Sequence, residues 1–264
     1  MKLLKFLTYF SFLLNAHANA AETQTTTLPK TVTSDDHSNG LPVNYGLVIF
    51  PGFTALDVFG PLDVFNSLSL NYTMNLFIIA ETLDPVSTKH PMPMPLNSNF
   101  TEAVVPTHTF ANPPENLDVL LVPGGVGSML EDPALDIPIH FIKETYPSLQ
   151  YLITVCTGVA LVAKAGILDG LKATGNKSVW AWVIAQGPNV DWVPHARWVH
   201  TKNIWTTSGV SAGLDGTYDF VRTVYGESVG INLANSLEYS PVMDWKDDKF
   251  ADLYNLTDSD TGSD

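Results

Sequence analysis

The sequence contains a single cysteine, Cys156, among its 264 residues. One cysteine cannot form an intramolecular disulfide, so packing alone must hold the core of the protein together. Basic residues are also scarce: 13 lysines and arginines stand against 27 aspartates and glutamates, and the formal net charge is −14. This balance argues against nucleic acids and anionic membrane surfaces as partners, because both need a basic surface on the protein.

Patterns for metal sites and membrane spans are missing as well. The seven histidines are scattered, and none lies in the HxxxH or HExxH spacing that would hold a metal ion. We therefore expect neither a metal nor another cofactor. After the N-terminal segment no stretch of about 20 apolar residues occurs, so the sequence predicts no membrane-spanning helix.

The first residues of the chain have the order that is typical of a signal peptide. Two lysines precede an apolar stretch that ends at Leu14, and the small residues Ala18 and Ala20 follow. We predict a signal peptide over residues 1–20 and a secreted protein, with a buried N-terminal helix as the alternative. Three sequons are candidate glycosylation sites if the source is eukaryotic: Asn71, Asn99 and Asn255.

The rest of the chain divides into a lead-in, one catalytic domain and a tail. Residues 21–43 are rich in Thr, Ser and Asp, a composition that is typical of a flexible segment. Residues 241–264 hold seven aspartates against two lysines, and we predict a solvated acidic tail there. The domain itself is predicted between these segments, over residues 44–240.

Within residues 44–240, short runs rich in Leu, Val and Ile alternate with helical patterns. Such runs suit strands that are buried on both faces of a parallel sheet, and the alternation predicts an α/β sandwich. The expected strands lie within residues 45–50, 75–80, 118–125 and 149–156. Helices are expected around residues 56–68, 134–146, 157–165 and 177–186 and from Ser211 to about Leu237, with a hairpin in residues 197–209.

Cys156 stands where an apolar strand meets a helical pattern. A cysteine at such a strand-to-helix turn resembles the nucleophile elbow of hydrolases, with Cys in the place of Ser. Backbone N–H groups and a helix N-terminus beside the sulfur would stabilise its thiolate form. The sequence therefore predicts an acidic, nucleophilic thiol; a buried and inert cysteine is the alternative.

Two further segments should meet Cys156 at the carboxyl ends of the strands, where open α/β sheets form their sites. Gly124 and Gly125 follow one strand directly, and their N–H groups could form an oxyanion hole; a plain turn is the alternative. Asp57 follows another strand and begins a helical pattern. It is either a helix N-cap or the carboxyl group of an active site, whereas Asp63 lies further along the helix as a surface or interface acid.

The motifs "FPGFTALDVFGPLDVF", "DVLLVPGG" and "VCTGVALVAKAGILDGLKAT", in this order, resemble the PfpI/ThiJ superfamily, relatives of class I glutamine amidotransferases. Within it the similarity is greatest to the isonitrile hydratase (cyclohexyl-isocyanide hydratase) group, and it covers residues 44–240. The resemblance implies a flavodoxin-like three-layer sandwich with a mostly parallel central sheet and a cysteine nucleophile elbow. It also implies a homodimer and a small-molecule substrate.

The resemblance assigns roles to individual residues. It makes Cys156 the nucleophile, Asp57 the catalytic aspartate, and Thr157 the threonine that follows the cysteine in isonitrile hydratases. Gly124 and Gly125 match the loop that supplies backbone amides near the sulfur.

The sequence also departs from other branches of the superfamily. Peptidase-like branches have His directly after the cysteine, where this chain has Thr157, so proteolysis is disfavoured. Many relatives have a His in the segment where this chain has Asn176 and Lys177. Asn176 is therefore a candidate pocket residue, and the identity of the substrate stays open.

These observations predict a cysteine-dependent hydratase or hydrolase of a small molecule, and first of all the hydration of an isonitrile to an N-substituted formamide. Cys156 would add to the terminal carbon while Asp57 delivers the proton and then activates water. One alternative is another thiol-dependent enzyme of the superfamily, a glyoxalase-type enzyme or an amide hydrolase. A non-enzymatic thiol redox sensor or ligand-binding protein is the other.

Overall fold

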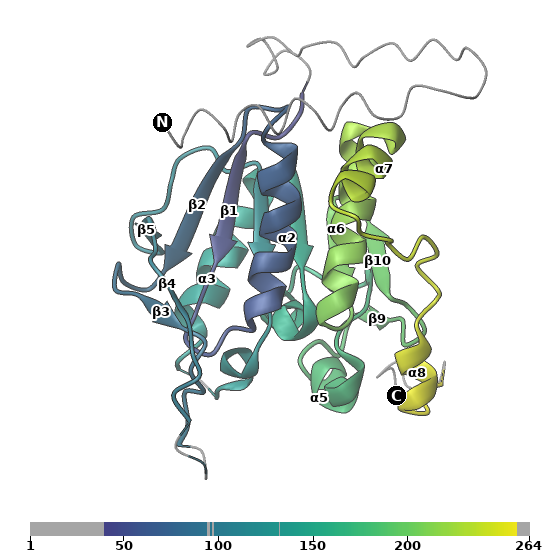
Figure 1. Cartoon of the computed structure of the whole chain (residues 1–264). Helices are drawn as coiled ribbons and strands as arrows, with labels where there is room; N and C mark the ends of the chain where they lie inside the picture. The colour runs from purple at the N-terminus through teal and green to yellow at the C-terminus, as the bar shows by residue number, and fades with distance from the viewer. Residues whose placement is uncertain (1–39, 94–95, 97, 132, 258–264) are drawn as a thin grey trace, which may run out of the picture. The chain divides into compact units, whose positions relative to one another are not determined.

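A seven-stranded sheet forms the centre of the domain (Figure 1). The structure is a computed structural model that describes residues 40–93, 96, 98–131 and 133–257. The strand order is β10-β11-β7-β6-β1-β2-β5, and every neighbouring pair is parallel except β10 with β11. The strands are β1 (Asn44–Val48), β2 (Asn75–Ala80), β5 (His108–Thr109), β6 (Val119–Val122), β7 (Tyr151–Thr154), β10 (Trp198–Thr201) and β11 (Ile204–Thr207).

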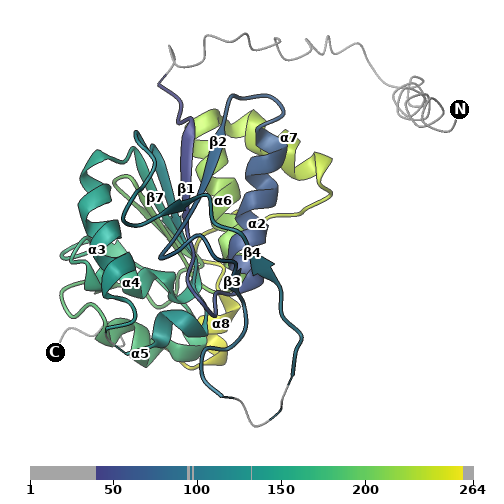
Figure 2. The same ribbon diagram turned by 90° about the vertical axis from the view of Figure 1, so that its left-hand side faces the viewer.

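Helices cover both faces of this sheet, which makes a three-layer sandwich (Figure 2). One layer contains α2 (Ala55–Leu68), α6 (Val210–Tyr225) and α7 (Glu227–Ser236), and the other contains α3 (Asp136–Thr145) and α4 (Val159–Lys164). The shorter helices are α5 (Trp180–Ala185), α8 (Lys249–Leu253), η2 (Val126–Met129), η3 (Tyr146–Ser148), η4 (Cys156–Gly158) and η5 (Lys177–Val179). Two small ribbons complete the fold: β3 (Val86–Ser87) with β4 (Ala103–Val104), and β8 (Lys172–Ala173) with β9 (Asp191–Trp192). The predicted α/β sandwich with a mostly parallel sheet is thus confirmed.

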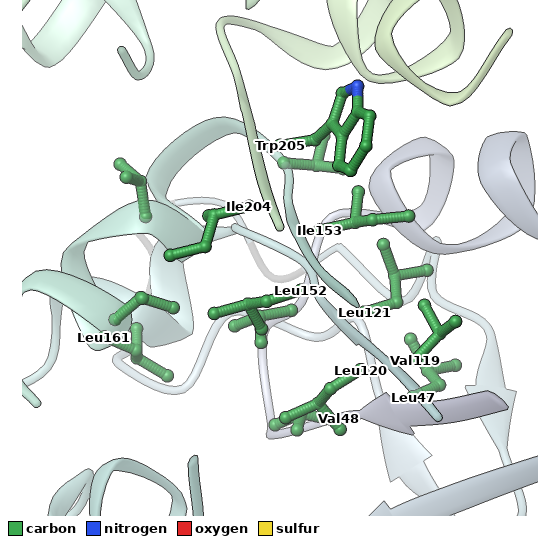
Figure 3. Packing of buried hydrophobic residues seen from close by; sticks show 14 of the residues in the cluster. Leu47, Val48, Val119, Leu120, Leu121, Leu152, Ile153, Leu161, Ile204 and Trp205 are labelled. Atoms are coloured by element: carbon green, nitrogen blue, oxygen red, sulfur yellow. The ribbon is translucent and has the colours of Figure 1, made fainter. Parts of the chain in front are cut away.

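The central strands are mostly apolar because helices bury them from both sides. All four residues of β6 are buried, and Leu120 packs beside Val48 of β1 and Leu152 of β7 (Figure 3). Each fully buried Leu, Ile or Val side chain contributes about 1.5–3 kcal/mol to folding. In a protein with one cysteine, this packing holds β1, β6 and β7 side by side.

The chain leaves these three neighbouring strands at the same edge of the sheet. The turn after β1 leads into α2, the turn after β6 carries the glycine pair, and the turn after β7 carries Cys156. Parallel strands point their carboxyl ends the same way, so residues from three distant parts of the sequence meet at one edge.

The long helix expected from Ser211 to about Leu237 is two helices, α6 and α7, separated at Gly226. Gly226 has φ 111° and ψ 148°, far outside the helical region. Glycine adopts this conformation at no steric cost, and it therefore ends α6 and lets the chain turn into α7.

The segment predicted as a solvated acidic tail packs against the domain as far as it is described. Residues 241–257 include α8, and Asp248 and Ala251 are buried. The excess of aspartates suggested solvation, but Asp248 has a buried partner, Lys177, at 3.3 Å. An acidic composition does not reveal whether one of its carboxylates meets a buried cation.

The structure gives no support to the predicted signal peptide. Residues 1–20 lie outside the described part of the chain. Among residues 40–257, apart from the short gaps named above, no helix is long and apolar enough to cross a membrane.

Candidate active site

Cys156 sits at a sharp turn between β7 and a helical segment. Its φ is +61°, the left-handed region that a residue with a Cβ rarely occupies, at a cost of about 1–2 kcal/mol. The next turn packs tightly, because a Cβ added to Gly158 would clash with the carbonyl oxygen of Val122. The predicted elbow is therefore present, and such stored backbone strain is typical of functional sites.

Asp57 reaches Cys156 from the first turn of α2, and its side chain is fully buried. It does not cap its helix: the residue at the N-cap is Thr54, and Oδ2 of Asp57 instead accepts a hydrogen bond from the N–H of Gly124 at 3.0 Å. Oδ1 has no hydrogen-bond partner among the described residues. Burial raises the pKa of Asp57 to about 7, although the Gly124 N–H and the neighbouring Cys156 thiol partly oppose that rise.

The thiol of Cys156 is not acidic, and this part of the prediction is wrong. Burial, and after it the charge of Asp57, raises the pKa of Cys156 to about 12; hydrogen bonds from Asn176 and Thr157 lower it only partly. The sequence suggested a helix N-terminus at the sulfur, but only a three-residue 3₁₀ turn begins there and α4 starts at Val159. At neutral pH the proton therefore stays on sulfur, and Asp57 is the group that changes its charge.

Asn176 supplies the direct contact to the sulfur. Its Nδ2 donates to Sγ of Cys156 at 3.0 Å. The orientation of the amide is fixed from the other end, because Oδ1 accepts the backbone N–H of Ser178 at 2.8 Å and also the Ser178 hydroxyl. The residue predicted as a candidate pocket member therefore presents an N–H donor to the nucleophile.

The glycine loop holds the carboxylate and a hydroxyl in place instead of presenting free N–H groups. The N–H of Gly124 is used by Asp57, and the N–H of Gly125 donates to Oγ1 of Thr157 at 2.9 Å. A Cβ on Gly124 would lie 2.6 Å from the nitrogen and Oγ1 of Thr157, so only glycine fits there. In this structure the expected oxyanion hole has both of its donors engaged.

Sequence reasoning missed Ser128 and the burial of Lys177. The Oγ of Ser128 lies 2.8 Å from Oγ1 of Thr157 and 2.7 Å from the carbonyl oxygen of Gly125, which fixes the threonine against the loop. Lys177 follows Asn176 and is buried. A lysine beside the apolar "VWAWVIA" could have signalled burial, but nothing marks Ser128 in the sequence.

A cavity of 330 Å³ opens beside these residues. Its lining includes Leu56, the neighbour of Asp57, and Asn176, which contacts the sulfur. The C-terminal helix α8 region contributes Phe250 and Tyr254. A larger cavity, of 720 Å³, lies between α3 and residues 110–117 and contains none of the site residues.

The sequence is similar to known proteins. A model of the DJ-1/PfpI family matches residues 46–224. An isonitrile hydratase from Pseudomonas putida is 31% identical over 208 residues, which are 76% of this chain and 80% of that protein.

Solved structures show the same fold. A THiJ/PfpI family protein from Pseudomonas syringae aligns with a TM-score of 0.62 and 23% identity over 94% of this chain and 98% of its own. An AraC family transcriptional regulator from Pseudomonas putida aligns with a TM-score of 0.61 and 18% identity over 74% and 100%. At these identities the likeness concerns the fold alone.

The comparisons contradict the prediction of a secreted glycoprotein with a signal peptide over residues 1–20. None of the three proteins just named is described as secreted, and a match across residues 46–224 weighs more than a short charge-then-apolar pattern. We withdraw the signal peptide and the secreted location. Glycosylation depended on secretion, so it is withdrawn too, although the three sequon asparagines are exposed: Asn71, Asn99 and Asn255.

Proposed function

The chain belongs to the DJ-1/PfpI family, and from this premise we propose that it is a cysteine-dependent hydratase that converts a small isonitrile into an N-substituted formamide. The observation that carries the proposal is the buried pair of Asp57 and Cys156, with an amide donor from Asn176 on the sulfur. The similarity to an isonitrile hydratase supports the choice of substrate.

The first step joins the sulfur to the isonitrile carbon. The ionised carboxylate of Asp57 takes the proton from the thiol as sulfur attacks the terminal carbon, and the new carboxylic acid returns that proton to the same carbon. An S–H bond breaks and C–S and C–H bonds form, which gives a thioformimidate on Cys156. Because the pKa of Asp57 is about 7 and that of Cys156 about 12, the carboxylate acts as a base that activates the thiol at the moment of attack.

The second step consumes water and releases the sulfur. Asp57, ionised again, takes a proton from water as the water oxygen adds to the thioformimidate carbon, and it passes this proton to the nitrogen. The C–S bond then breaks as the C–OH group becomes C=O, Asp57 transfers the hydroxyl proton to the sulfur, and the formamide leaves. The N–H of Asn176 stabilises the negative charge that develops on Sγ when it leaves, a role that its 3.0 Å contact allows.

The test is a substrate screen on the wild type, Cys156→Ala and Cys156→Ser in parallel. Cyclohexyl isocyanide is incubated with each protein, and N-cyclohexylformamide is quantified by chromatography. The wild type should turn over and both variants should not. Methylglyoxal and a small amide, assayed on the same samples, test the glyoxalase-type and amidohydrolase alternatives; turnover of either with none of the isocyanide would overturn the proposal.

One observation weighs against the thiol sensor. Oxidation to sulfenic acid requires a thiolate that is accessible, and Cys156 is 6% exposed with a raised pKa. A sensor should show stoichiometric oxidation by peroxide without turnover, and this can be measured by mass spectrometry on the single cysteine.

We also propose that the chain forms a homodimer, as its resemblance to the superfamily implies. Light scattering at micromolar concentrations should give twice the chain mass of 28.8 kDa. A monomer mass across that range would contradict the dimer without affecting the proposed chemistry.

A further inference from the structure

The C-terminal segment Val242–Leu256, called the strap below, lies beyond the residues that match the family model. Three of its contacts with the domain involve buried groups. The N–H of Val242 donates to the buried Asp215 at 3.0 Å, and the N–H of Arg197 donates to the carbonyl oxygen of Trp245 at 2.6 Å. The third contact is the ion pair between Lys177 and Asp248 at 3.3 Å.

The Lys177–Asp248 pair is the most demanding of these contacts, because the two side chains are 1% and 0% exposed. The ammonium of Lys177 also donates to Oγ1 of Thr174 at 2.6 Å and to the carbonyl oxygens of Gly175 and Ala196 at 3.0 and 2.9 Å. A buried charge of this kind is tolerated only when its partners are in place. The pair therefore holds the strap in a defined position beside the site.

Asp248 also caps the helix α8. Its Oδ1 accepts the N–H of Phe250 at 3.1 Å and so caps the first turn of α8, while Oδ2 faces Lys177. One side chain thus starts the helix and anchors it. Since Lys177 follows Asn176, the anchor lies one residue from the group that contacts the sulfur.

The strap supplies the outer wall of the cavity beside the nucleophile. Phe250 and Tyr254 share the cavity lining with Leu56, which precedes Asp57 in the chain, and with Asn176, whose Nδ2 donates to Sγ of Cys156. Asp57 and Cys156 are not part of this lining, so Asn176 is the lining residue that links the cavity to the sulfur. The cavity volume of 330 Å³ is at the low end of small-molecule sites, which are about 300–1,000 Å³.

We propose that the strap determines substrate selectivity: Phe250 and Tyr254 bind the apolar group on the isonitrile nitrogen, and Lys177 and Asp248 are positioning residues that hold this wall. The inference rests on the proposed hydratase function and deepens it, because it names the residues that would select isonitriles with a cyclic aliphatic or aryl group. A linear or very small isonitrile would not fill the space between the rings and Leu56.

The kinetic test compares cyclohexyl isocyanide with methyl isocyanide on the wild type, Phe250→Ala and Tyr254→Ala. Leu253→Ala is the matched control, because Leu253 is on the same helix, is 65% exposed and is not part of the cavity lining. The two aromatic variants should lose about 10-fold or more in kcat/KM for the cyclic substrate, mainly through KM, and little for the methyl substrate. Equal losses on both substrates, or none, would overturn the inference.

A second readout does not need turnover. Cys156 is the only cysteine, so the ratio of its alkylation rates by N-cyclohexylmaleimide and by iodoacetamide reports the shape of the cavity directly. Phe250→Ala should change this ratio several-fold and Leu253→Ala should not. If no isonitrile is hydrated but Phe250→Ala changes the ratio, the proposed hydratase function is wrong and the role of the strap is supported. If isonitrile is hydrated but the ratio does not change, the hydratase function is supported and the role of the strap is wrong.

The positioning role of the Lys177–Asp248 ion pair is tested with the same ratio of alkylation rates. Asp248→Asn keeps the cap on Phe250 but leaves the Lys177 ammonium without its charged partner, so the selectivity between the two reagents should fall. Adding Lys177→Met removes both charges and should restore much of the selectivity if the pair acts by position. A double variant with no better selectivity than the single one would overturn the positioning role of the pair.

Discussion

The structure contains two buried pairs of ionisable groups close to each other, Asp57 with Cys156 and Lys177 with Asp248. The two pairs differ in the groups that surround them. Asp57 and Cys156 both have raised pKa values, and Oδ1 of Asp57 has no hydrogen-bond partner among the residues described. In the other pair, the ammonium of Lys177 meets a carboxylate and three further oxygens. The first pair can exchange a proton at neutral pH. The second is an ion pair below about pH 8, because burial lowers the pKa of Lys177 to about 8 although Asp248 opposes that fall. Oδ2 of Asp248, like Oδ1 of Asp57, has no hydrogen-bond partner among the residues described, but it lies 3.3 Å from a cation.

The difference shows how burial produces either reactivity or rigidity. Desolvation is the largest influence on the pKa values of Asp57, Cys156 and Lys177, and the neighbouring groups oppose it to different degrees. The Gly124 N–H and the Cys156 thiol stabilise the carboxylate of Asp57 only partly, so burial still raises its pKa to about 7. The predictions below disturb one pair at a time, in order of decreasing effect.

The largest effect is expected for Asp57→Asn. The amide can still accept the N–H of Gly124, so the fold should survive, but no group is left to move the proton between sulfur and carbon. Turnover of cyclohexyl isocyanide should fall by about 10²–10⁴-fold. Asp63→Asn is the matched control, since Asp63 is on the same helix and exposed, and it should keep wild-type kcat/KM. Near wild-type activity in Asp57→Asn would remove the acid–base role.

The pH dependence of wild-type turnover also tests the acid–base role of Asp57. Asp57 must be ionised to accept the thiol proton, and burial raises its pKa to about 7. The value of kcat/KM should therefore rise with pH through about 7 and level off above it. A profile that rises only near the pKa of Cys156, about 12, would mean that the thiolate must form without help from Asp57.

Breaking the second pair should affect stability first. Lys177→Met leaves the buried carboxylate of Asp248 without its cation, and such a loss typically costs about 3–5 kcal/mol of unfolding free energy. Urea unfolding followed by tryptophan fluorescence measures this cost. The exposed Lys202→Met is the control and should change stability by less than about 0.5 kcal/mol.

The sequence anticipated the parts of the site that depend on chain order and missed those that depend on tertiary burial. Strand-then-turn patterns located Asp57, Gly124 and Cys156 at one edge, and the structure places them together. The rise in the pKa of Cys156 was not predictable, because it results from packing by distant segments. For the same reason, the sequence predicted that Asp248 is solvated, whereas in the structure it is buried against Lys177.

A smaller effect on stability follows from the destabilised Asp57. Its folded pKa, about 7, lies above 3.8, the ordinary pKa of an exposed aspartate, so the stability that it contributes is present below pH 3.8 and is lost as pH rises through 7. Three pKa units correspond to about 4 kcal/mol at most. Asp57→Asn should therefore be more stable than the wild type at pH 8, with the advantage shrinking toward pH 4. Equal unfolding curves at pH 8 would mean that the buried carboxylate is not destabilised.

The smallest effect is expected for Ser128→Ala, which tests whether the glycine loop serves the first pair by position. The Ser128 hydroxyl lies within hydrogen-bond distance of Oγ1 of Thr157 and of the carbonyl oxygen of Gly125, and the N–H of Gly125 also holds that threonine. Removing one of these linked bonds should cost about 1–2 kcal/mol of stability. It should lower kcat a few-fold and leave KM unchanged, because no contact with the cavity lining is lost. Ser128→Thr, which keeps the hydroxyl, should recover most of kcat. If Ser128→Ala loses stability but keeps full kcat, the loop supports the fold and not the alignment of Asp57 with Cys156.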